Sequence, residues 1–211
     1  MLIIGAKGQA MEILQCLTVD LRAQVVFFDD VAIGQLDTVL GQYPLIRSTT
    51  EAQVYLMHTD SRFVLGLGGP TKRCHLAAQF REWGGVLTTV IASTAVVGPH
   101  VAKLGAGVTI MHHTLVAPNV WLGEGVLLNA GAAVHHDAQV GAYCEISPGA
   151  RLLGRCRLGS GCQVGAMGVV LPDVIIGDNA IIGAGAVVTR NVAAGATVVG
   201  VPARPLAVSR K

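Results

Sequence analysis

Large aliphatic residues recur at every sixth position along the second half of the chain. Stepping six residues at a time from Leu104, fifteen successive positions hold Leu, Ile or Val without a break. A fixed short period is the signature of a repeat architecture, in which each unit buries its apolar face against its neighbours. The positions are Leu104, Ile110, Val116, Leu122, Leu128, Val134, Val140, Ile146, Leu152, Leu158, Val164, Val170, Ile176, Ile182 and Val188.

A second, smaller position accompanies the first. Four residues after each large aliphatic comes a small residue or Val, and Gly often follows the large residue directly. We interpret each hexapeptide as one short flat strand and one corner, so that three units close a triangular coil and coils stack into a prism. Gly is expected at corners that disfavour a Cβ. Residues 104–193 therefore predict about five coils of a parallel β-helix.

The hexapeptide register also assigns the cysteines. Cys144, Cys156 and Cys162 occupy the small inward position, where we expect them to fill the interior rather than act as ligands or nucleophiles. With Cys16 and Cys74 the chain has five cysteines and no Cys-x-x-Cys. An odd number without such spacing argues against a disulfide framework and against a zinc knuckle.

The first part of the chain follows a different pattern. Residues 1–4 are apolar, Gly5 and Gly8 allow a tight turn, and a helix follows with Met11 and Leu14 on one face together with Leu17. A strand, a glycine loop and a helix in this order can place a phosphate at the helix N-terminus. The loop lacks the complete dinucleotide-binding fingerprint, so a plain strand–helix turn is the competing interpretation.

Further strands are expected at 23–30 and 62–69, and a helix from Pro70 to about Trp83 that ends at Gly84–Gly85. These elements predict a small α/β domain with a parallel sheet over 1–92, with ligands at the carboxyl ends of its strands. The β-helix and a C-terminal tail would occupy 93–211.

Charge and hydropathy exclude several classes of function. The formal net charge is +2 and the basic residues are scattered, so the sequence shows no basic patch that would bind nucleic acid. Mean hydropathy is +0.57, yet no stretch reaches the roughly 20 apolar residues that a membrane helix needs. The opening "MLIIGAKG" has too short an apolar run for a signal peptide. We therefore expect a cytoplasmic protein without membrane insertion.

His135, His136 and Asp137 stand together in a segment that is otherwise small and apolar. Because Val134 points inward, these three residues form the next corner and point out of the prism. A His poised near neutral pH is a suitable general base, and an adjacent Asp can fix its tautomer. The alternative is a solvated corner where His and Asp merely tolerate the turn. His100 and the pair His112–His113 are expected at the surface, with a sugar pocket as the alternative for the pair.

Several motifs, in their order along the chain, carry a resemblance that spans nearly all of it. They are "IIGAKGQAMEI" near the start, "FFDD" at 27–30, "LGLGGPTKR" at 65–73, the hexapeptides, "NAGAAVHHDAQVGAYCEISPGA" at 129–150 and "GAGAVVTRNVAAGATVVGVPARPL" at 183–206. The chain resembles the nucleotide-aminosugar acetyltransferases of the bacillosamine and perosamine type and the related sialic acid O-acetyltransferases. The resemblance implies a left-handed β-helix, an exception to the usual right-handed crossover.

In that family the small N-terminal domain holds the sugar nucleotide. The resemblance implies that the glycine loop approaches the diphosphate or sugar, that Asp29 and Asp30 approach the base or ribose, and that Gly68 lies by the nucleotide. Gln9 stands where the typical loop carries a His, and Asn129 matches a residue beside the substrate amine. The loop residues are Gly5, Lys7, Gly8 and Gln9.

The family's prism holds acetyl-CoA between adjacent subunits of a homotrimer and needs no metal. The resemblance implies that His136 is the base, Asp137 its orienting acid and Gly154 the oxyanion donor, with His135 lining the site. Glu145 stands where relatives often carry a second His near the thioester. Contacts to coenzyme A are expected from Gly165, Ala166, Gly183, Ala184, Arg190 and Arg204, with ordinary surface charge as the alternative for the two arginines.

The implied activity is direct acetyl transfer to the amino group of a UDP-, dTDP- or GDP-linked 4-amino-4,6-dideoxy sugar, in surface glycan biosynthesis. O-acetylation of a sialic acid is the alternative within the same class. A zinc-dependent prism of the γ-carbonic anhydrase sort would need stacked histidines roughly 18 residues apart. Here His112–His113 and His135–His136 are 23 residues apart (135 − 112) and no third His fits. A scaffold without catalysis would leave the glycine loop and the histidine corner unexplained.

Overall fold

The computed structural model describes residues 1–31, 38–100 and 103–206. The chain divides into two compact units, Met1–Ser93 and a second that begins at Thr94. This division lies beside the boundary expected after residue 92. Residues 207–211, the last part of the expected C-terminal tail, lie outside the described residues.

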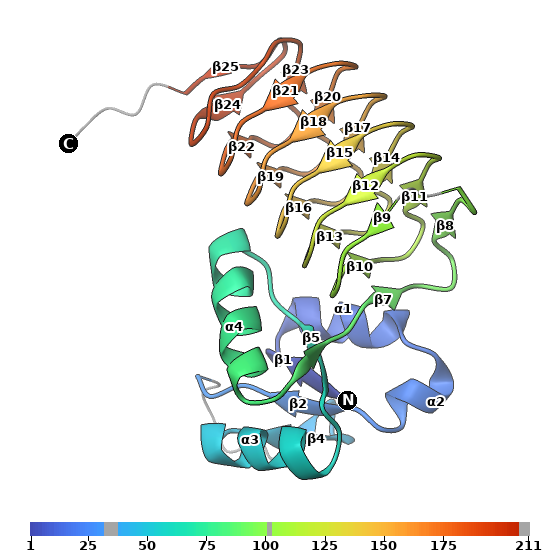
Figure 1. The fold of residues 1–211 in the computed structure, drawn as a ribbon, viewed down its shortest axis with the longest axis vertical. Helices are drawn as coiled ribbons and strands as arrows, with labels where there is room; N and C mark the ends of the chain where they lie inside the picture. Colours follow the sequence, from blue (N-terminus) through green and yellow to red (C-terminus); the bar gives the residue numbers. More distant parts are fainter. Residues whose placement is uncertain (32–37, 101–102, 207–211) are drawn as a thin grey trace, which may run out of the picture. The chain divides into compact units, whose positions relative to one another are not determined.

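The N-terminal unit is an α/β fold around one sheet (Figure 1). The sheet has the strand order β3-β4-β2-β1-β5-β6; β3 pairs antiparallel with β4 and the other pairings are parallel. The elements are β1 (Leu2–Ile4), α1 (Gly8–Cys16), α2 (Val19–Arg22), β2 (Val26–Phe28), β3 (Thr38–Val39), β4 (Tyr43–Ile46), α3 (Thr49–His58), β5 (Arg62–Leu65), α4 (Pro70–Glu82), β6 (Val86–Leu87) and β7 (Val90–Ile91).

The three strands and two helices expected from the sequence are present, although β2 ends at Phe28, so that Asp29 and Asp30 follow its carboxyl end, and β5 ends at Leu65 rather than at residue 69. Helix α1 buries Ala10, Ile13 and Leu14, with Leu17 buried just beyond its end. Met11, expected on the same face, is only half-buried. Compared with the face expected from the sequence, α1 is rotated so that the small residue Ala10 faces the sheet. Ala10 packs there against Gly66, at the end of β5.

The second unit is the expected prism, a left-handed parallel β-helix of stacked triangular coils (Figure 1). We name its three faces after the strands of one early coil. The β10 face contains β10 (Thr109–Ile110), β13 (Leu127–Leu128), β16 (Glu145–Ile146), β19 (Gln163–Val164), β22 (Ile181–Ile182), β24 (Thr197–Val199) and β25 (Arg204–Pro205).

The other two faces have the same construction. The β11 face contains β8 (Val96–Val97), β11 (Leu115–Val116), β14 (Ala133–Val134), β17 (Arg151–Leu152), β20 (Val169–Val170) and β23 (Val187–Val188). The β12 face contains β9 (Lys103–Leu104), β12 (Trp121–Leu122), β15 (Gln139–Val140), β18 (Arg157–Leu158) and β21 (Ile175–Ile176). Among the described strands of this unit, only β25, at the C-terminal end, pairs antiparallel, with β24.

The interior of the prism has the residues that the register predicts. From Ile110 to Val188 every large inward aliphatic is buried, and Leu104 packs partly buried against the same core. Cys144, Cys156 and Cys162 are fully buried among them. Burial raises the pKa of the Cys156 thiol to about 12, which leaves it protonated and unreactive at neutral pH.

The glycines that follow the large aliphatics were expected because of their backbone conformation, but the structure shows that they are needed for lack of space. Gly123 and Gly141 do not have positive φ; a Cβ on Gly123 would lie 2.6 Å from the backbone nitrogen of Ala142 in the next coil. These glycines therefore allow successive coils to stack closely. The left-handed backbone conformation falls two residues later, and non-glycine residues such as Asn119 (φ 59°) and Asp137 (φ 61°) adopt it.

Among the residues that the structure describes, no helix is both long enough and apolar enough to span a membrane.

Candidate active site

His136 and Asp137 lie on the corner that follows β14, with their side chains in direct contact. Nδ1 of His136 and Oδ2 of Asp137 are 2.7 Å apart, and Nδ2 of Asn119 donates to Oδ1 of Asp137 at 3.2 Å. Because Nδ1 is engaged, Nε2 is the ring nitrogen left to exchange a proton with a ligand. This is the arrangement that a histidine base and its orienting carboxylate require.

The surroundings of Asp137 favour its ionised form. The hydrogen bond from His136 lowers the pKa of the Asp137 carboxyl, and the bond from Asn119 lowers it further. An ionised carboxylate only accepts hydrogen bonds, so Nδ1 carries a proton, and Nε2 is the atom at which the imidazole can accept a second one. The His136 and Asp137 side chains are 54% and 45% exposed, which leaves them open to a ligand.

Gly154, one coil beyond His136, provides the space in which the imidazole lies. A Cβ on Gly154 would lie 2.6 Å from both Cε1 and Nε2 of the ring, closer than real side chains approach. The N–H groups of Leu153 and Arg155 bond to Val170 and His136, but the N–H of Gly154 donates to no residue that the structure describes. A backbone donor beside Nε2 is therefore available to an anionic oxygen.

Of the other residues expected at the acyl-transfer site, His135 precedes His136 on the same corner, whereas Asn129 follows β13 and Glu145 lies in β16, both on the β10 face. Asn129 is 4% exposed on the corner after β13, and its N–H donates to the carbonyl of Ile146. Glu145 lies in β16 on the outer side of the β10 face, partly buried between its cross-strand neighbours. His135 is partly buried next to His136. The structure thus groups His136, Asp137 and Gly154 on one corner.

The candidate coenzyme A contacts lie on the corners that follow β19 and β22. Gly165 and Gly183 donate their N–H groups to the next coil, whereas the N–H groups of Ala166 and Ala184 donate to no described residue. Both alanines are exposed. Unpaired donors that stack one coil apart suit the amides of a pantetheine arm.

A groove of about 340 Å³ lies at the C-terminal end of the prism. Arg190 and Arg204 both line it, and their exposed guanidinium groups suit phosphate oxygens. The rest of the lining is largely apolar: Val188, Asn191, Val192, Ala193, Ala196, Val198, Ala203 and Pro205. The charge and the apolar floor together fit a phosphorylated nucleoside.

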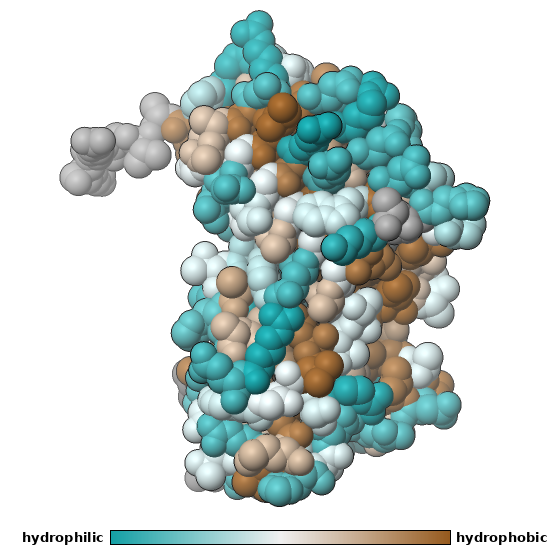
Figure 2. Space-filling view, viewed as in Figure 1, coloured by the Kyte–Doolittle hydropathy of each residue, from teal (hydrophilic) through white to brown (hydrophobic). Residues whose placement is uncertain are grey.

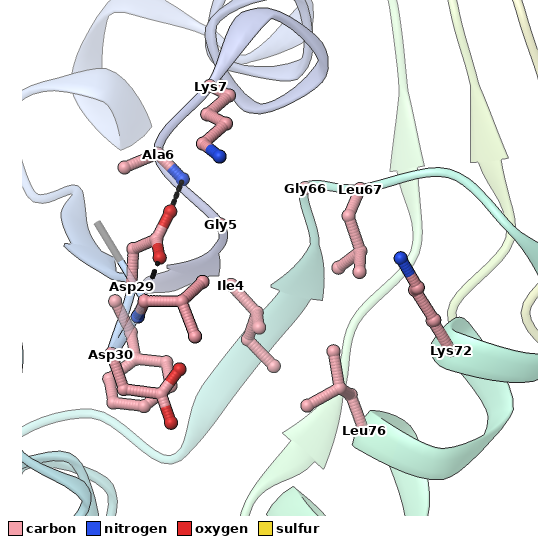
Figure 3. A pocket seen from close by; sticks show the side chains of 12 residues that line it. Ile4, Gly5, Ala6, Lys7, Asp29, Asp30, Gly66, Leu67, Lys72 and Leu76 are labelled. Atoms are coloured by element: carbon pink, nitrogen blue, oxygen red, sulfur yellow. Dashed lines mark hydrogen bonds between the residues drawn. The ribbon is translucent and has the colours of Figure 1, made fainter. Parts of the chain in front are cut away.

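The N-terminal unit has its own cavity, of about 270 Å³, at the carboxyl ends of β1, β2 and β5 (Figure 3). The uncapped N-terminus of α1 begins beside it, since Lys7 at the N-cap makes no side-chain capping bond. Lys7 and Lys72 bring two ammonium groups from different elements, which with the helix dipole favour a diphosphate. The lining residues are Ile4, Gly5, Ala6, Lys7, Phe28, Asp29, Asp30, Val31, Gly66, Leu67, Lys72 and Leu76.

The carboxylate of Asp29 accepts its hydrogen bonds from backbone groups that line this cavity. It is 7% exposed, and its two oxygens accept from the N–H groups of Ala6 and Val31, each at 3.1 Å (Figure 3). These bonds hold the glycine loop against the end of β2. Asp30, in contrast, is exposed at the cavity. Of the two acidic residues, Asp30 has the carboxylate that is accessible to a ligand.

Three expected residues do not line this cavity, namely Gly8, Gln9 and Gly68. Sequence reasoning missed Lys72 and Leu76, although Pro70 at the start of α4 was a signal, because it puts Lys72 in the first turn beside the end of β5. It also missed Arg73, which is fully buried and donates to the carbonyls of Leu65 (3.0 Å) and Leu67 (2.9 Å). Arg73 therefore fixes the loop after β5, which forms one wall of the cavity.

Three other histidines of the prism, His100, His112 and His113, lie on coils before that of His136. Nδ1 of His112 lies 2.7 Å from the hydroxyl of Thr94, which also accepts from the N–H of His113. His100 and His113 are exposed. Within residues 1–31, 38–100 and 103–206, no three His, Cys, Asp or Glu side chains gather as a metal site.

Comparison with known proteins places this geometry in a family. The bacterial transferase hexapeptide model (six repeats) matches residues 119–154 and 155–190. A search of curated proteins found no match. Among solved structures, a histidine mutant of perosamine N-acetyltransferase from Caulobacter crescentus, in complex with CoA and GDP-perosamine, is 30% identical. It covers 98% of this chain and 96% of its own, with a TM-score of 0.87.

Two further structures agree. The acetyltransferase domain of PglB from Neisseria gonorrhoeae, in complex with acetyl coenzyme A, is 28% identical over 97% of this chain and 98% of its own, with a TM-score of 0.85. WeeI from Acinetobacter baumannii is 28% identical over the same shares, with a TM-score of 0.87. The likeness extends through both units and the hexapeptides. This chain therefore belongs to the nucleotide-aminosugar N-acetyltransferases of the hexapeptide-repeat acyltransferase superfamily.

Proposed function

We propose that this protein transfers an acetyl group from acetyl-CoA to the amino group of a nucleotide-linked 4-amino-4,6-dideoxy sugar, a step in surface glycan biosynthesis. The observation that carries the proposal is the His136–Asp137 pair, 2.7 Å apart, beside Gly154, whose N–H donates to no residue in the described part of the chain. The pair lies in a chain that is 30% identical to a perosamine N-acetyltransferase. A base and an oxyanion donor at one corner are what direct acyl transfer requires.

In the proposed reaction, acetyl-CoA supplies an activated thioester. The sugar amine attacks the acyl carbon, and Nε2 of His136 accepts the proton that the nitrogen must lose as the amide forms. Asp137 holds Nδ1 protonated and stabilises the imidazolium, while the N–H of Gly154 donates to the negative charge that develops on the acyl oxygen. The imidazolium then returns its proton to the departing thiolate. A well-placed base contributes roughly 10²–10⁴-fold to such a rate.

For the acyl donor we assign the corners after β19 and β22 and the groove at the end of the prism. The N–H groups of Ala166 and Ala184 would pair with the pantetheine amides, at corners also lined by Gly165 and Gly183. Arg204 would bind phosphate, with Arg190 across the same groove. His135, next to His136 on the reacting corner, and Glu145, in β16, are assigned to the walls of the acyl site.

For the nucleotide sugar we assign the cavity of the N-terminal unit. Gly5 and Lys7 at the start of α1, together with Lys72, would hold the diphosphate, and Asp30 would accept from a ribose or base donor. Asp29 supports the loop. Asn129 is assigned to the amine end of the sugar. The cavity lining does not include Gly8, Gln9 or Gly68. We assign these residues a contact only with a part of the sugar that extends beyond the cavity.

We further propose that the protein acts as a homotrimer in the cytoplasm, where nucleotide sugars and acetyl-CoA meet. The exposure of His136 and Asp137 supports the trimer, because a neighbouring prism would exclude water from them. Large apolar side chains, including Met167 (65%) and Ile175 (48%), also remain exposed on the prism. Figure 2 shows hydrophobic residues interspersed with hydrophilic ones on the visible face.

The test is a panel of UDP-, dTDP- and GDP-linked 4-amino-4,6-dideoxy sugars with acetyl-CoA, with thiol release as the readout. We expect turnover with one nucleotide class and an amide product. Free sialic acid is the control acceptor, because sialic acid O-acetylation is the alternative within this fold. Turnover of sialic acid with silence across the aminosugars would overturn the proposal, and a monodisperse monomer that retains full activity would overturn the trimer.

A further inference from the structure

The corner row of the active site continues beyond His136 and Asp137. Asn119, Asp137, Arg155 and Asp173 occupy the same position in four successive coils, each in the left-handed conformation with φ of 59°, 61°, 62° and 63°. A shared backbone conformation at a coil spacing stacks their side chains in one ladder outside the prism. Along the ladder the side chains are, in order, an amide, a carboxylate, a guanidinium and a second carboxylate.

On one side of Asp137 the neighbour is Asn119. Its Nδ2 donates to Oδ1 of Asp137 at 3.2 Å, while Oδ2 of the same carboxylate faces His136 at 2.7 Å. Each oxygen therefore has its own donor, and the two bonds fix the plane of the carboxylate. Asn119 is itself held, because its N–H donates to the carbonyl of His100 at 2.9 Å.

On the other side the neighbour in the ladder is Arg155, a cation that can compete for the same carboxylate. Its positive charge is close enough to lower the pKa of Asp137. Its hydrogen bonds, however, go to Asp173, from Nε at 2.7 Å and from the terminal nitrogen at 2.8 Å. A bidentate arginine–carboxylate pair of this kind has a strong geometric preference. Asp173 thus directs Arg155 away from Asp137 and leaves Oδ2 to His136.

We propose that Asn119 and Asp173 are positioning residues of the acetyl-transfer reaction: Asn119 orients the Asp137 carboxylate, and Asp173 keeps Arg155 from displacing His136 on it. This inference rests on the proposed function, since it assigns His136 as the base. Neither residue touches a reacting atom. Both act through Asp137, so their substitution should change kcat rather than the KM of either substrate.

The first arm of the test removes the Asn119 amide. Asn119→Gly keeps a residue suited to positive φ, so the backbone is not strained, and Asn119→Asp keeps the shape but replaces the donor with a second carboxylate. We expect kcat to fall about 3- to 10-fold for the Gly variant and further for the Asp variant. The matched control is Asn179→Gly, a left-handed corner asparagine (φ 56°) on a different row of the prism.

A double-mutant cycle separates positioning from a general structural effect. In an Asp137→Asn background the Asn119 amide has no carboxylate to orient, so Asn119→Gly should then have no further effect on kcat. An equal loss in both backgrounds would contradict the role of Asn119. Thermal unfolding of each variant, compared with Asn179→Gly, reports whether the corner itself is retained.

The second arm releases Arg155. Asp173→Asn removes the charge that holds the guanidinium, and we expect kcat to fall about threefold or more as Arg155 turns toward Asp137. Adding Arg155→Ala to that variant should restore kcat, because the competitor is then absent. Failure of the second substitution to restore activity would overturn the role of Asp173.

These outcomes remain distinct from failure of the proposed function. If the wild-type protein transfers no acetyl group, or if His136→Ala retains full activity, the proposed function is wrong. If wild-type activity depends on His136 while kcat is unchanged in Asn119→Gly and Asp173→Asn, the function stands and this inference is wrong.

Discussion

The imidazole of His136 lies against the α-carbon of Gly154, in the space that the Cβ of any other residue would occupy. Its Cε1 and Nε2 atoms would each be 2.6 Å from that Cβ. The two residues come from successive coils, so the stacking of the prism sets their distance. The same contact brings Nε2, the ring nitrogen of His136 that Asp137 does not engage, next to the N–H of Gly154, which donates to no described residue.

Substitution of Gly154 by Ala should therefore impair catalysis far more than folding. The added methyl group displaces the exposed ring, and a shift of about 1 Å in a base can cost about 10²-fold in rate. Because the ring can move into solvent, the melting temperature should change little. Measurement of kcat and of thermal unfolding checks both expectations.

Gly98→Ala is the matched control for that variant. A Cβ on Gly98 would make only an ordinary contact, 3.6 Å from the carbonyl of Val116. It should leave both kcat and stability close to the wild-type values. Equal activity loss in the two variants would mean that the space beside His136 is not what matters.

Lys72 should contribute to binding of the nucleotide sugar and not of acetyl-CoA. Lys72→Met removes one of the two ammonium groups that line the N-terminal cavity, and loss of a charge-assisted phosphate contact should raise the KM for the nucleotide sugar about tenfold. The KM for acetyl-CoA should not change. Lys103→Met, an exposed lysine on the β12 face, is the control, and an equal effect there would refute a site at Lys72.

Asp29 and Asp30 are adjacent in sequence but should differ in their effect on stability. Asp29→Ala leaves the N–H groups of Ala6 and Val31 without their acceptor, which should lower the free energy of unfolding by about 2 kcal/mol. Asp30→Ala, at an exposed position, should change it by less than about 0.5 kcal/mol. Urea unfolding of the N-terminal unit measures the difference, and similar values for both variants would show that the Asp29 bonds are dispensable.

Asp60 should make the stability of the N-terminal unit depend on pH. The hydrogen bonds from Arg62, at 2.8 and 3.0 Å, lower the pKa of the Asp60 carboxyl below its ordinary value. A carboxyl whose pKa is lower in the folded state stabilises the fold above its unfolded pKa, about 4, and loses that effect as pH falls.

Asp60→Asn should accordingly reduce the free energy of unfolding by about 1 kcal/mol at pH 7, and the difference should shrink as the pH is lowered from about 5 toward 2. Denaturant melts of both proteins across this range provide the measurement. Glu12→Gln, at an exposed position of α1, is the control. A difference that stays constant with pH would contradict the ionic contribution.

The sequence predicted the prism well because its period is a direct physical constraint. Each inward position must be aliphatic whatever lies outside, so Ile110 to Val188 could be assigned without knowledge of other contacts. The α/β unit was harder. Helix α3 and strand β4 were not expected, because α3 buries only Ala52 and Leu56 and β4 contains Pro44, and neither segment shows a clear period.

The candidate site was predictable in part for the same reason. His136 and Asp137 are adjacent in sequence, and the coil length aligns Gly154 with them. The amide of Asn119 and the ion pair of Arg155 with Asp173 depend on side-chain rotamers, which the period does not determine. At the end of β2 the sequence likewise gives no means of telling that Asp29 bonds the backbone while Asp30 faces the cavity.

The most direct measurement is acetyl transfer to a nucleotide-linked 4-amino-4,6-dideoxy sugar by the wild-type protein and by His136→Asn, with the amide product detected by mass spectrometry. Asn fills much of the same space but is not a base at neutral pH. We expect a wild-type amide product and a fall in kcat of at least about 10²-fold in the variant. Wild-type turnover with an unchanged kcat in His136→Asn, or no amide product with any nucleotide class, would contradict it.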